Sequence, residues 1–202
     1  MRYNVYALGI MAAIISFLGF VVENVLLAIT KGYINNRNMN TPFLLGYGLL
    51  VIVFYFVLGT PNQMVLPKNL KKRLSRRAKY IFYFLCAFFV VCIAEIILGE
   101  IVERLCGIEY WNYENLPFHI TKYTSVPTSI AFASIITFFM GVCFEPVMEL
   151  ILQMDIRWMK VLSITLMTIM GVDFFVSFRM MIKRRDYYLK WKIFLRKKRV
   201  LN

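Results

Sequence analysis

The stretch YALGIMAAIISFLGFVVENVLLAI, residues 6–29, decides the class of fold. A helix needs about 20 apolar residues to cross a bilayer, and this stretch exceeds that length with Glu23 as its one charged side chain. Because hydrocarbon offers no hydrogen-bond partners, such a segment must satisfy its own backbone as a helix. The apolar run continues without a small-residue cleavage site, so we interpret it as a retained first span and not as a signal peptide.

Four further apolar segments follow this first span. They lie at about residues 42–60, 80–103, 128–153 and 161–178. Hydrophobic residues make up 60% of the chain, and its 202 residues leave no room for a soluble domain beside five spans. The sequence therefore predicts an all-α polytopic transmembrane helical bundle over residues 1–182, with a basic amphipathic tail at residues 183–202.

The net charge of +13 comes largely from two basic stretches, residues 68–79 and 179–199. Basic clusters beside spans fix topology and contact anionic lipid headgroups, so we expect no nucleic-acid partner. The positive-inside rule assigns both stretches to the cytoplasmic side. Five complete crossings from a cytoplasmic N-terminus would instead place the tail outside. A re-entrant fourth segment, interrupted at Glu145-Pro146, would restore agreement.

The tail itself has a helical pattern of aromatic and apolar residues. Tyr187, Trp191, Phe194 and Leu195 recur at helical spacing among lysines and arginines. A helix with these two faces can lie along a membrane surface and attract anionic headgroups. We therefore predict an interfacial helix on the cytoplasmic face.

Small residues and a carboxylate share one face of the first span. At 3.6 residues per turn, Ala12, Ser16, Gly19 and Glu23 fall on a narrow stripe. Small residues on one face let two helix backbones approach closely. We expect this face to pack against another helix, and we expect Arg37, in the following loop, to lie within reach of an acidic group.

The third and fifth segments carry similar faces. The third segment brings five residues to one side: Cys92, Glu95, Gly99, Glu103 and Cys106. In the fifth, Ser177 lies one turn after Asp173. A charged carboxylate near the bilayer centre costs about 2.5–3.5 kcal/mol on insertion scales, so these acids should face the bundle, pair or become protonated. The sequence predicts a shared polar interior, whose role could be structural, in binding or transport, or in acid–base chemistry.

Several kinds of chemistry lack their motifs. His119 is the only histidine, so no multi-histidine metal site can form, and we expect no metal and no cofactor. Neither a GxSxG elbow nor a GxxxxGK[ST] phosphate loop occurs. Any ATP-driven step would therefore need a partner ATPase or another membrane subunit. We find no convincing internal repeat in the sequence.

The order of several motifs resembles the family of small bacterial membrane proteins described as putative ABC-transporter type IV, or CmpB-type. The first-span pattern is similar to GFVVE ending in Glu23, and a second is similar to NNRNMNTPFLLGYG at residues 35–48. The third-span acids resemble IAEIILGEIVE at residues 93–103. The most specific motif is similar to WNYENLPFHI at residues 111–120, where Asn112 stands in place of the family's Asp. Pro146 and Asp173 also match family positions.

The resemblance implies a helical bundle whose polar residues line a cavity that opens to the outer face, with residues 110–118 at its rim. The residues expected to contact a substrate are Glu23, Arg37, Tyr47, Glu95, Glu103, Trp111, Asn112, Tyr113, His119 and Asp173.

We predict an integral membrane transport component, either permease-like or a subunit that binds a solute or lipid, in the bacterial plasma membrane. One alternative is an intramembrane enzyme acting on a lipid, with His119 and one of the acids Glu23, Glu95 or Asp173; we favour transport over catalysis. A second alternative is a scaffold or regulator without a ligand.

Overall fold

The computed structural model describes residues 3–65 and 74–195 of the chain. Residues 66–73 of the basic loop and residues 196–202 of the tail lie outside the described residues. The chain forms two compact units, the first from Met1–Leu50 with Met154–Asn202 and the second from Val51–Gln153. Within the described residues, four helical segments are long and apolar enough to cross a membrane: Val5–Lys31, Arg76–Cys106, Val126–Leu152 and Ile156–Arg184. The predicted all-α architecture is confirmed.

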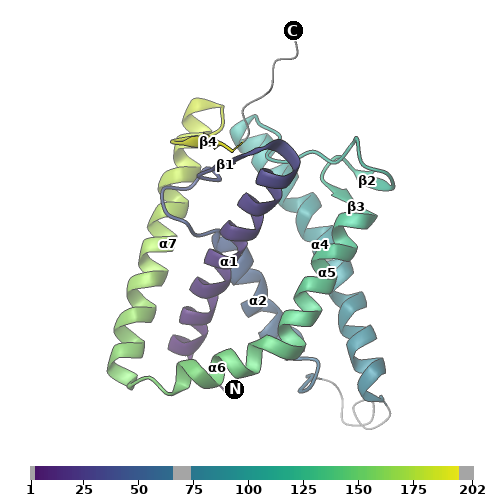
Figure 1. Cartoon of the computed structure of the whole chain (residues 1–202), viewed down its shortest axis with the longest axis vertical. Helices are drawn as coiled ribbons and strands as arrows, with labels where there is room; N and C mark the ends of the chain where they lie inside the picture. The colour runs from purple at the N-terminus through teal and green to yellow at the C-terminus, as the bar shows by residue number, and fades with distance from the viewer. Residues whose placement is uncertain (1–2, 66–73, 196–202) are drawn as a thin grey trace. The chain divides into compact units, whose positions relative to one another are not determined.

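The first unit contains two long helices, α1 (Val5–Lys31) and α7 (Ile156–Arg184), which lie side by side and run parallel (Figure 1). At their starting ends, Asn4 Nδ2 lies 3.5 Å from Met159 Sδ. At their far ends, strand β1 (Tyr33–Asn35), which follows α1, pairs with strand β4 (Lys192–Phe194), which follows α7. Parallel helices that both cross place Val5 and β4 on opposite faces. The cytoplasmic location of both the N-terminus and the tail stays a prediction, because it depends on whether both helices cross completely.

The tail does not continue as the helix that its aromatic spacing predicts. The helix α7 ends at Arg185, which adopts a left-handed conformation with φ 54°. The described tail then runs extended into β4, whose register pairs Tyr33 with Phe194. The Leu195 N–H also donates to the Gly32 carbonyl at 2.9 Å. The edge of β1 has backbone N–H and C=O groups that can pair with a second strand, and the tail forms these hydrogen bonds instead of continuing as a helix. The helical prediction is therefore wrong for residues 186–195.

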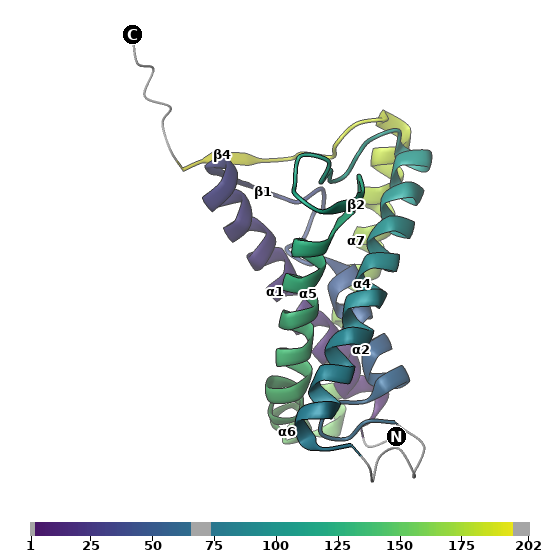
Figure 2. The same cartoon turned by 90° about the vertical axis from the view of Figure 1, so that its right-hand side faces the viewer.

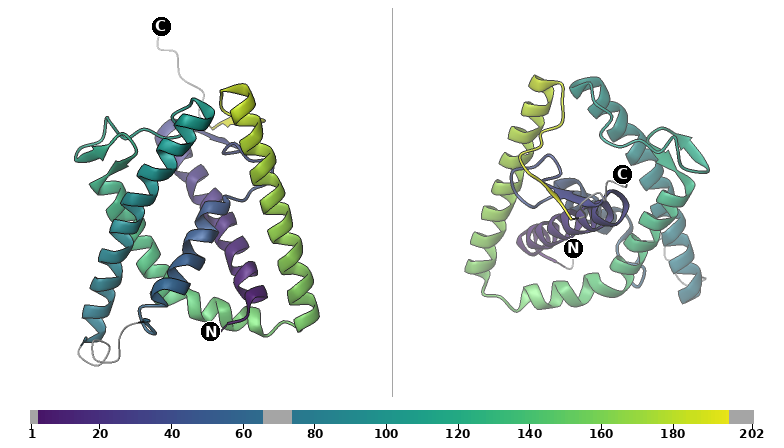
Figure 3. Two further views of the ribbon diagram at one scale, coloured as in Figure 1. Left: turned by 180° about the vertical axis from the view of Figure 1, so that it is seen from behind. Right: turned by 45° about the horizontal axis from the view of Figure 1, so that its top comes forward.

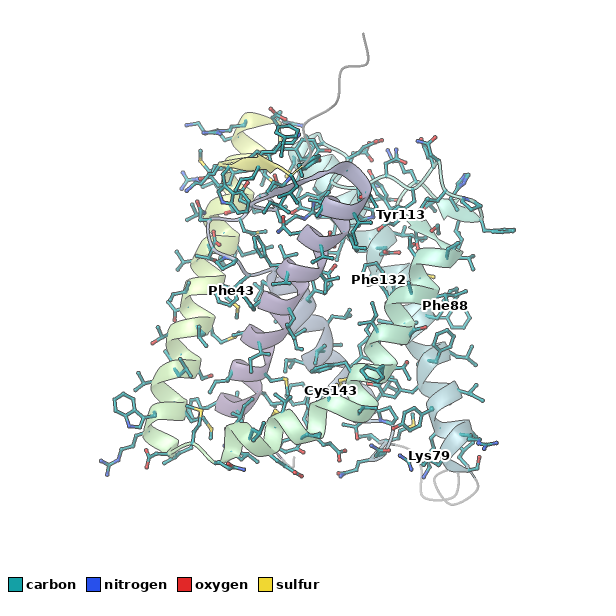
Figure 4. All side chains as sticks on the ribbon, viewed as in Figure 1. Phe43, Lys79, Phe88, Tyr113, Phe132 and Cys143 are labelled. Atoms are coloured by element: carbon teal, nitrogen blue, oxygen red, sulfur yellow. The ribbon has the colours of Figure 1, made fainter. Side chains whose placement is uncertain are left out.

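Between β1 and the next helix, residues 36–44 extend down into the first unit between α1 and α7, and we call them the inserted segment (Figure 3). At its deep end, the Leu44 N–H donates to the Ser16 carbonyl at 3.0 Å. Ser16 lies about 17 Å along α1 from Val5 and about 23 Å from Lys31, at 1.5 Å per residue. Phe43, labelled in Figure 4, marks this depth. Non-helical backbone therefore reaches the middle of α1.

The helix α2 (Leu45–Leu58) starts where the inserted segment ends. Its 14 residues span about 21 Å, which is less than the roughly 30 Å of a bilayer core. The inserted segment and α2 together thus replace a continuous second span. The sequence predicted one apolar segment here, at residues 42–60, and did not separate the irregular part from the helix.

The second unit pairs α4 (Arg76–Cys106) with α5 (Val126–Phe138), which run antiparallel (Figure 2). Ser75 caps α4, because its hydroxyl accepts from the Ala78 N–H at 3.2 Å, and Ser125 caps α5 in the same way. The connection between them contains the short strands β2 (His119–Thr121) and β3 (Thr124–Ser125). This connection returns the chain onto the face of α4 that carries its carboxylates.

The fourth apolar segment is continuous, although Pro146 lies within it. A π-helical turn, η1 (Phe139–Cys143), joins α5 to α6 (Phe144–Leu152). In the i→i−5 register of this turn, the Gly141 carbonyl would pair with residue 146, and proline has no N–H. Asn62 and Tyr80 donate to that carbonyl instead, at 2.9 and 3.0 Å. The interruption predicted beside Pro146 is therefore this π-helical turn, after which α6 bends away from the direction of α5 (Figure 1), and a re-entrant course stays a prediction.

Candidate functional site

The Glu23 cluster of the first unit consists of Glu23, Arg37 and Tyr47. Glu23 Oε1 accepts from the Tyr47 hydroxyl at 2.5 Å, and Glu23 Oε2 accepts from Arg37 Nη2 at 2.9 Å. The side chains of the ion pair stay partly exposed, at 22% for Glu23 and 17% for Arg37. The carboxylate in the first span is therefore paired but reachable, and the expected acidic partner of Arg37 is Glu23.

The small-residue stripe of α1 is the surface on which α2 begins. A Cβ added at Gly48 would lie 2.2 Å from the Ala12 carbonyl oxygen and 2.5 Å from Ser16 Oγ. A Cβ added at Gly19 would lie 2.6 Å from Cγ of Tyr47. The predicted packing of this face against another helix is confirmed. This close approach carries the Tyr47 hydroxyl to Glu23.

The inserted segment starts with two residues in the left-handed region. Arg37 has φ 47° and Asn38 has φ 60°, a conformation that costs non-glycine residues free energy. Asn38 is 4% exposed, and its Oδ1 contacts no hydrogen-bond donor among the described residues. Strain and an unsatisfied buried acceptor coincide next to the Glu23 cluster. Such features concentrate at functional sites.

Asp173 of α7 anchors the deeper part of the inserted segment. Its Oδ1 accepts from the Asn40 backbone N–H at 2.9 Å, from Asn40 Nδ2 at 2.6 Å and from the Ser177 hydroxyl at 2.9 Å. Its Oδ2 accepts from the Thr41 backbone N–H at 2.7 Å and from the Thr41 hydroxyl. Five donors saturate the carboxylate, whose residue is 6% exposed. Asp173 therefore replaces the hydrogen bonds that Asn40 and Thr41 lack outside a helix.

The tail fixes the inserted segment from the other side. Asn36 Nδ2 donates to the Tyr188 carbonyl at 3.0 Å, and Asn36 Oδ1 accepts from the Lys190 N–H at 3.1 Å. The Tyr188 hydroxyl donates to Asn40 Oδ1 at 3.0 Å. These contacts join the tail, the inserted segment and α7 into one hydrogen-bonded network.

In the second unit, the Glu103 cluster consists of Glu103, Lys122, Tyr123 and Glu109. Lys122 Nζ lies 2.6 Å from Glu103 Oε1 and 3.0 Å from Glu109 Oε1. The Tyr123 hydroxyl donates to Glu103 Oε2 at 2.5 Å. A Cβ added at Gly99 would lie 2.2 Å from Cγ of Tyr123. The acid-bearing face of α4 is thus covered by the returning chain.

The side chains of this cluster shift one another's pKa values. Hydrogen bonds to Glu103 and then Glu109 raise the pKa of Lys122 above its usual 10.5. The Asn112 amide and then the Lys122 ammonium hold the pKa of Glu109 below its usual 4.5. Burial, followed by the hydrogen bond to Glu103, raises the pKa of Tyr123 to about 12. Near neutral pH the cluster contains two carboxylates, one ammonium and a neutral phenol.

Glu95 lies two turns below Glu103 on α4. Its Oε2 accepts from the Thr124 hydroxyl at 2.6 Å and from the Ser129 hydroxyl at 3.4 Å. Thr124 and Ser129 are both fully buried. The deepest acid of this unit therefore contacts the start of α5. Glu23 and Asp173 belong to the first unit and Glu95 to the second, so their shared interior stays a prediction.

The aromatic connection after α4 contacts the Glu103 cluster through Trp111. Its Nε1 donates to the Tyr123 carbonyl at 2.8 Å, and its ring lies edge-on to Tyr123 with centroids 6.0 Å apart. The Tyr113 N–H donates to the Lys122 carbonyl at 2.8 Å. Asn112 Nδ2 donates to Glu109 at 2.9 Å. These residues hydrogen-bond to members of the cluster, and their contact with a substrate stays a prediction.

His119 lies apart from the acids. It is exposed in β2, and its Nδ1 lies 3.2 Å from the Leu116 carbonyl oxygen, the ring's one hydrogen-bond contact in the described chain. The enzymatic alternative, in which His119 acts with Glu23, Glu95 or Asp173, stays a prediction. Conversely, sequence reasoning missed Asn40, Thr41, Lys122 and Tyr123. The polar run NNRNMNT and the lysine after PFHIT were the available signals.

Comparison with known proteins gives one family. The family model described as putative ABC-transporter type IV matches residues 10–178, which include every residue of the two clusters. None of the curated proteins and none of the solved structures matches the chain.

Proposed function

Because the chain belongs to the family described as putative ABC-transporter type IV, we propose that it is a membrane-embedded transport component that binds and passes a small polar or lipidic solute. The bacterial plasma membrane is the proposed location. A partner ATPase would supply the energy for any active step, because the sequence carries no phosphate-binding loop of its own.

The observation that carries this proposal is the exposure of two residues near the depth of Ser16: Pro42 in the inserted segment and Gly46 in the first turn of α2. A Cβ added at Gly46 would meet no atom within 4 Å. Irregular backbone at membrane depth is tolerated only where protein covers it or a water-filled cavity adjoins it. The exposure of Pro42 and Gly46 therefore favours a water-filled path beside these two residues.

The short helix α2 supports the same reading. In many transporters, substrates bind where a span is broken into irregular backbone and a half-helix, whose N-terminus carries a partial positive charge. Here α2 begins directly after Leu44, whose apolar side chain cannot cap it. The start of α2 thus presents its positive end at mid-depth, next to the open side of Gly46.

Thiol labelling tests the proposal. In a chain whose four cysteines are replaced, Pro42→Cys and Gly46→Cys are reacted with a membrane-impermeant methanethiosulfonate in vesicles. Phe175→Cys is the matched control, because Phe175 is 73% exposed on α7 at the depth of Asp173. We expect the thiols introduced at Pro42 and Gly46 to react from one side at least 100-fold faster than the control. Equal rates at all three positions would reject an aqueous path and with it the transport function.

A further inference from the structure

The two polar clusters share one construction, although they come from different units. In the first unit, Gly19 and Glu23 lie four residues apart on α1, the Tyr47 ring covers Gly19, and its hydroxyl donates to Glu23 at 2.5 Å. The second oxygen of Glu23 accepts from a cation, Arg37, at 2.9 Å. Both residues that complete the cluster come from the chain that follows α1.

The second unit repeats these relations with a lysine in place of the arginine. Gly99 and Glu103 lie four residues apart on α4, the Tyr123 ring covers Gly99, and its hydroxyl donates to Glu103 at 2.5 Å. The second oxygen of Glu103 accepts from Lys122 at 2.6 Å. Tyr123 follows Gly99 by 24 residues, whereas Tyr47 follows Gly19 by 28. The different spacing hides the repeat in the sequence. We call each set of glycine, glutamate, tyrosine and cation a module.

Stability alone does not account for two such modules. Replacing a buried ion pair by well-packed apolar residues is often neutral or stabilising. The ion pairs also stay accessible, since Lys122 is 29% and Glu103 37% exposed, and the first module is exposed to a similar degree. A residue in a solvent-accessible ion pair can exchange its partner for a charged group of a ligand, whereas a residue in a fully buried ion pair cannot.

The charges define the ligand that can make this exchange. In the first module, a ligand with one charge would leave either Glu23 or Arg37 unpaired in a partly buried place, which is costly. A zwitterion pairs both, because its ammonium takes the carboxylate while its phosphate or carboxylate takes the arginine or lysine. Asn38 Oδ1, buried without a donor among the described residues, offers a further acceptor for an ammonium beside Arg37. In the second module, Lys122 is already 3.0 Å from Glu109 Oε1, so it would pair with that carboxylate and with the ligand's anionic group together.

We propose that the two modules are duplicated recognition sites for a zwitterion that carries an ammonium and an anionic group, such as an aminoalkyl phosphate. This inference rests on the proposed transport function and names its substrate class. The zwitterion can be a free solute or a phospholipid headgroup, since the chemistry that the module contacts is the same.

Calorimetry on the full chain in maltoside micelles tests this proposal. The free probe is phosphoethanolamine, with ethylammonium and ethyl phosphate as single-charge controls. The lipid probe is dihexanoyl phosphatidylethanolamine, with the phosphatidylglycerol analogue as its control. We expect two equivalents of at least one zwitterionic probe to bind, and each single-charge probe to bind at least 10-fold more weakly. Binding of the free probe identifies a solute, and binding of the lipid alone identifies a headgroup.

Substitutions assign the binding to the modules. Glu23→Gln and Glu103→Gln should each reduce the stoichiometry from two to one, and the double variant should bind none. Glu100→Gln is the matched control, because Glu100 pairs with Arg104 on the same helix as Glu103 but outside the module. If either glutamine variant unfolds, Tyr47→Phe or Tyr123→Phe replaces it, with an expected 10-fold loss of affinity.

Three results would overturn the inference: binding of a single-charge probe as tight as that of the zwitterion, an unchanged stoichiometry in both glutamine variants, or no binding of either zwitterionic probe. Each leaves the thiol-labelling result at Pro42 and Gly46 intact, so failure of the substrate class is distinguishable from failure of the transport function.

Discussion

The ring of Tyr47 lies directly against Gly19, so that a Cβ added at Gly19 would stand 2.6 Å from Tyr47 Cγ. This contact brings the start of α2 onto α1 and sets the position of the Tyr47 hydroxyl on Glu23. The approach of α2 to α1 and the position of the Tyr47 hydroxyl therefore both depend on the absence of a Cβ at Gly19.

Gly19→Ala should destabilise the protein by about 1–3 kcal/mol, because the added methyl group forces the Tyr47 ring away from α1. Gly171→Ala is the matched control, since a Cβ there meets no atom within 4 Å and alanine favours the helix by roughly 0.5–1 kcal/mol. Unfolding midpoints in denaturant, measured in detergent, check both. Equal midpoints for the two variants would contradict the contact.

Asp173→Asn should lower the free energy of unfolding by about 1.5–3 kcal/mol. The reason is that the amide puts an NH₂ group where one carboxylate oxygen accepted hydrogen bonds, opposite the N–H groups of Asn40 and Thr41 that also donate. Amide hydrogen exchange at Asn40 and Thr41 should accelerate at the same time. Asp155→Asn is the control, because asparagine preserves the cap on α7 and should change stability by only a few tenths of a kcal/mol. Unchanged exchange at Thr41 in Asp173→Asn would refute the anchor.

The Glu103 cluster should be intact over a broad pH range. The pKa of Glu109 is lowered, so its contribution is present above pH 4.5 and is lost as the pH falls through the lowered value. The pKa of Lys122 is raised, so its contribution is full below pH 10.5 and is lost as the pH rises through the raised value.

Fluorescence of Trp111, which contacts Tyr123, reports this pH range when Trp158 and Trp191 are replaced by Phe. The signal should stay flat between about pH 5 and 10. Lys122→Met should move the acid transition to higher pH, because Glu109 loses the cation that helps to lower its pKa. An acid transition that stays in place in Lys122→Met would show that the lysine does not stabilise this carboxylate.

The parallel packing of α1 and α7 predicts that the two ends of the first unit lie on opposite faces of the membrane. Val5→Cys and Leu195→Cys, each in a background without the native cysteines, should therefore label from opposite sides of intact vesicles with an impermeant thiol reagent. Both positions are exposed. Labelling of both from the same side would require that α1 or α7 does not cross.

The sequence predicted those parts of the fold that depend on local periodicity. The apolar runs located the helices within a few residues, and the stripe of Ala12, Ser16 and Gly19 predicted a close helix contact because side-chain size alone decides it. The ion pair of Arg37 followed from the cost of leaving a charge unpaired.

The remainder depended on contacts between distant residues. The inserted segment descends because Asp173, more than 130 residues away, supplies its hydrogen bonds. The tail forms β4 because β1 offers an unpaired edge, an interaction that a helical pattern at Tyr187 and Trp191 cannot reveal. The sequence did not reveal the two modules, because the number of residues between the glutamate and its tyrosine differs between them.

The most direct test of the account measures both depth and water contact where the inserted segment joins α2. A nitroxide at Gly46→Cys, in vesicles, is compared with one at Phe175→Cys by collision with a water-soluble nickel complex and with oxygen, which concentrates in lipid. The account predicts that Gly46 collides with the nickel complex at least 10-fold more often than Phe175 at a similar depth. A spectrum in which Gly46 is reached by oxygen and not by nickel would contradict the aqueous path.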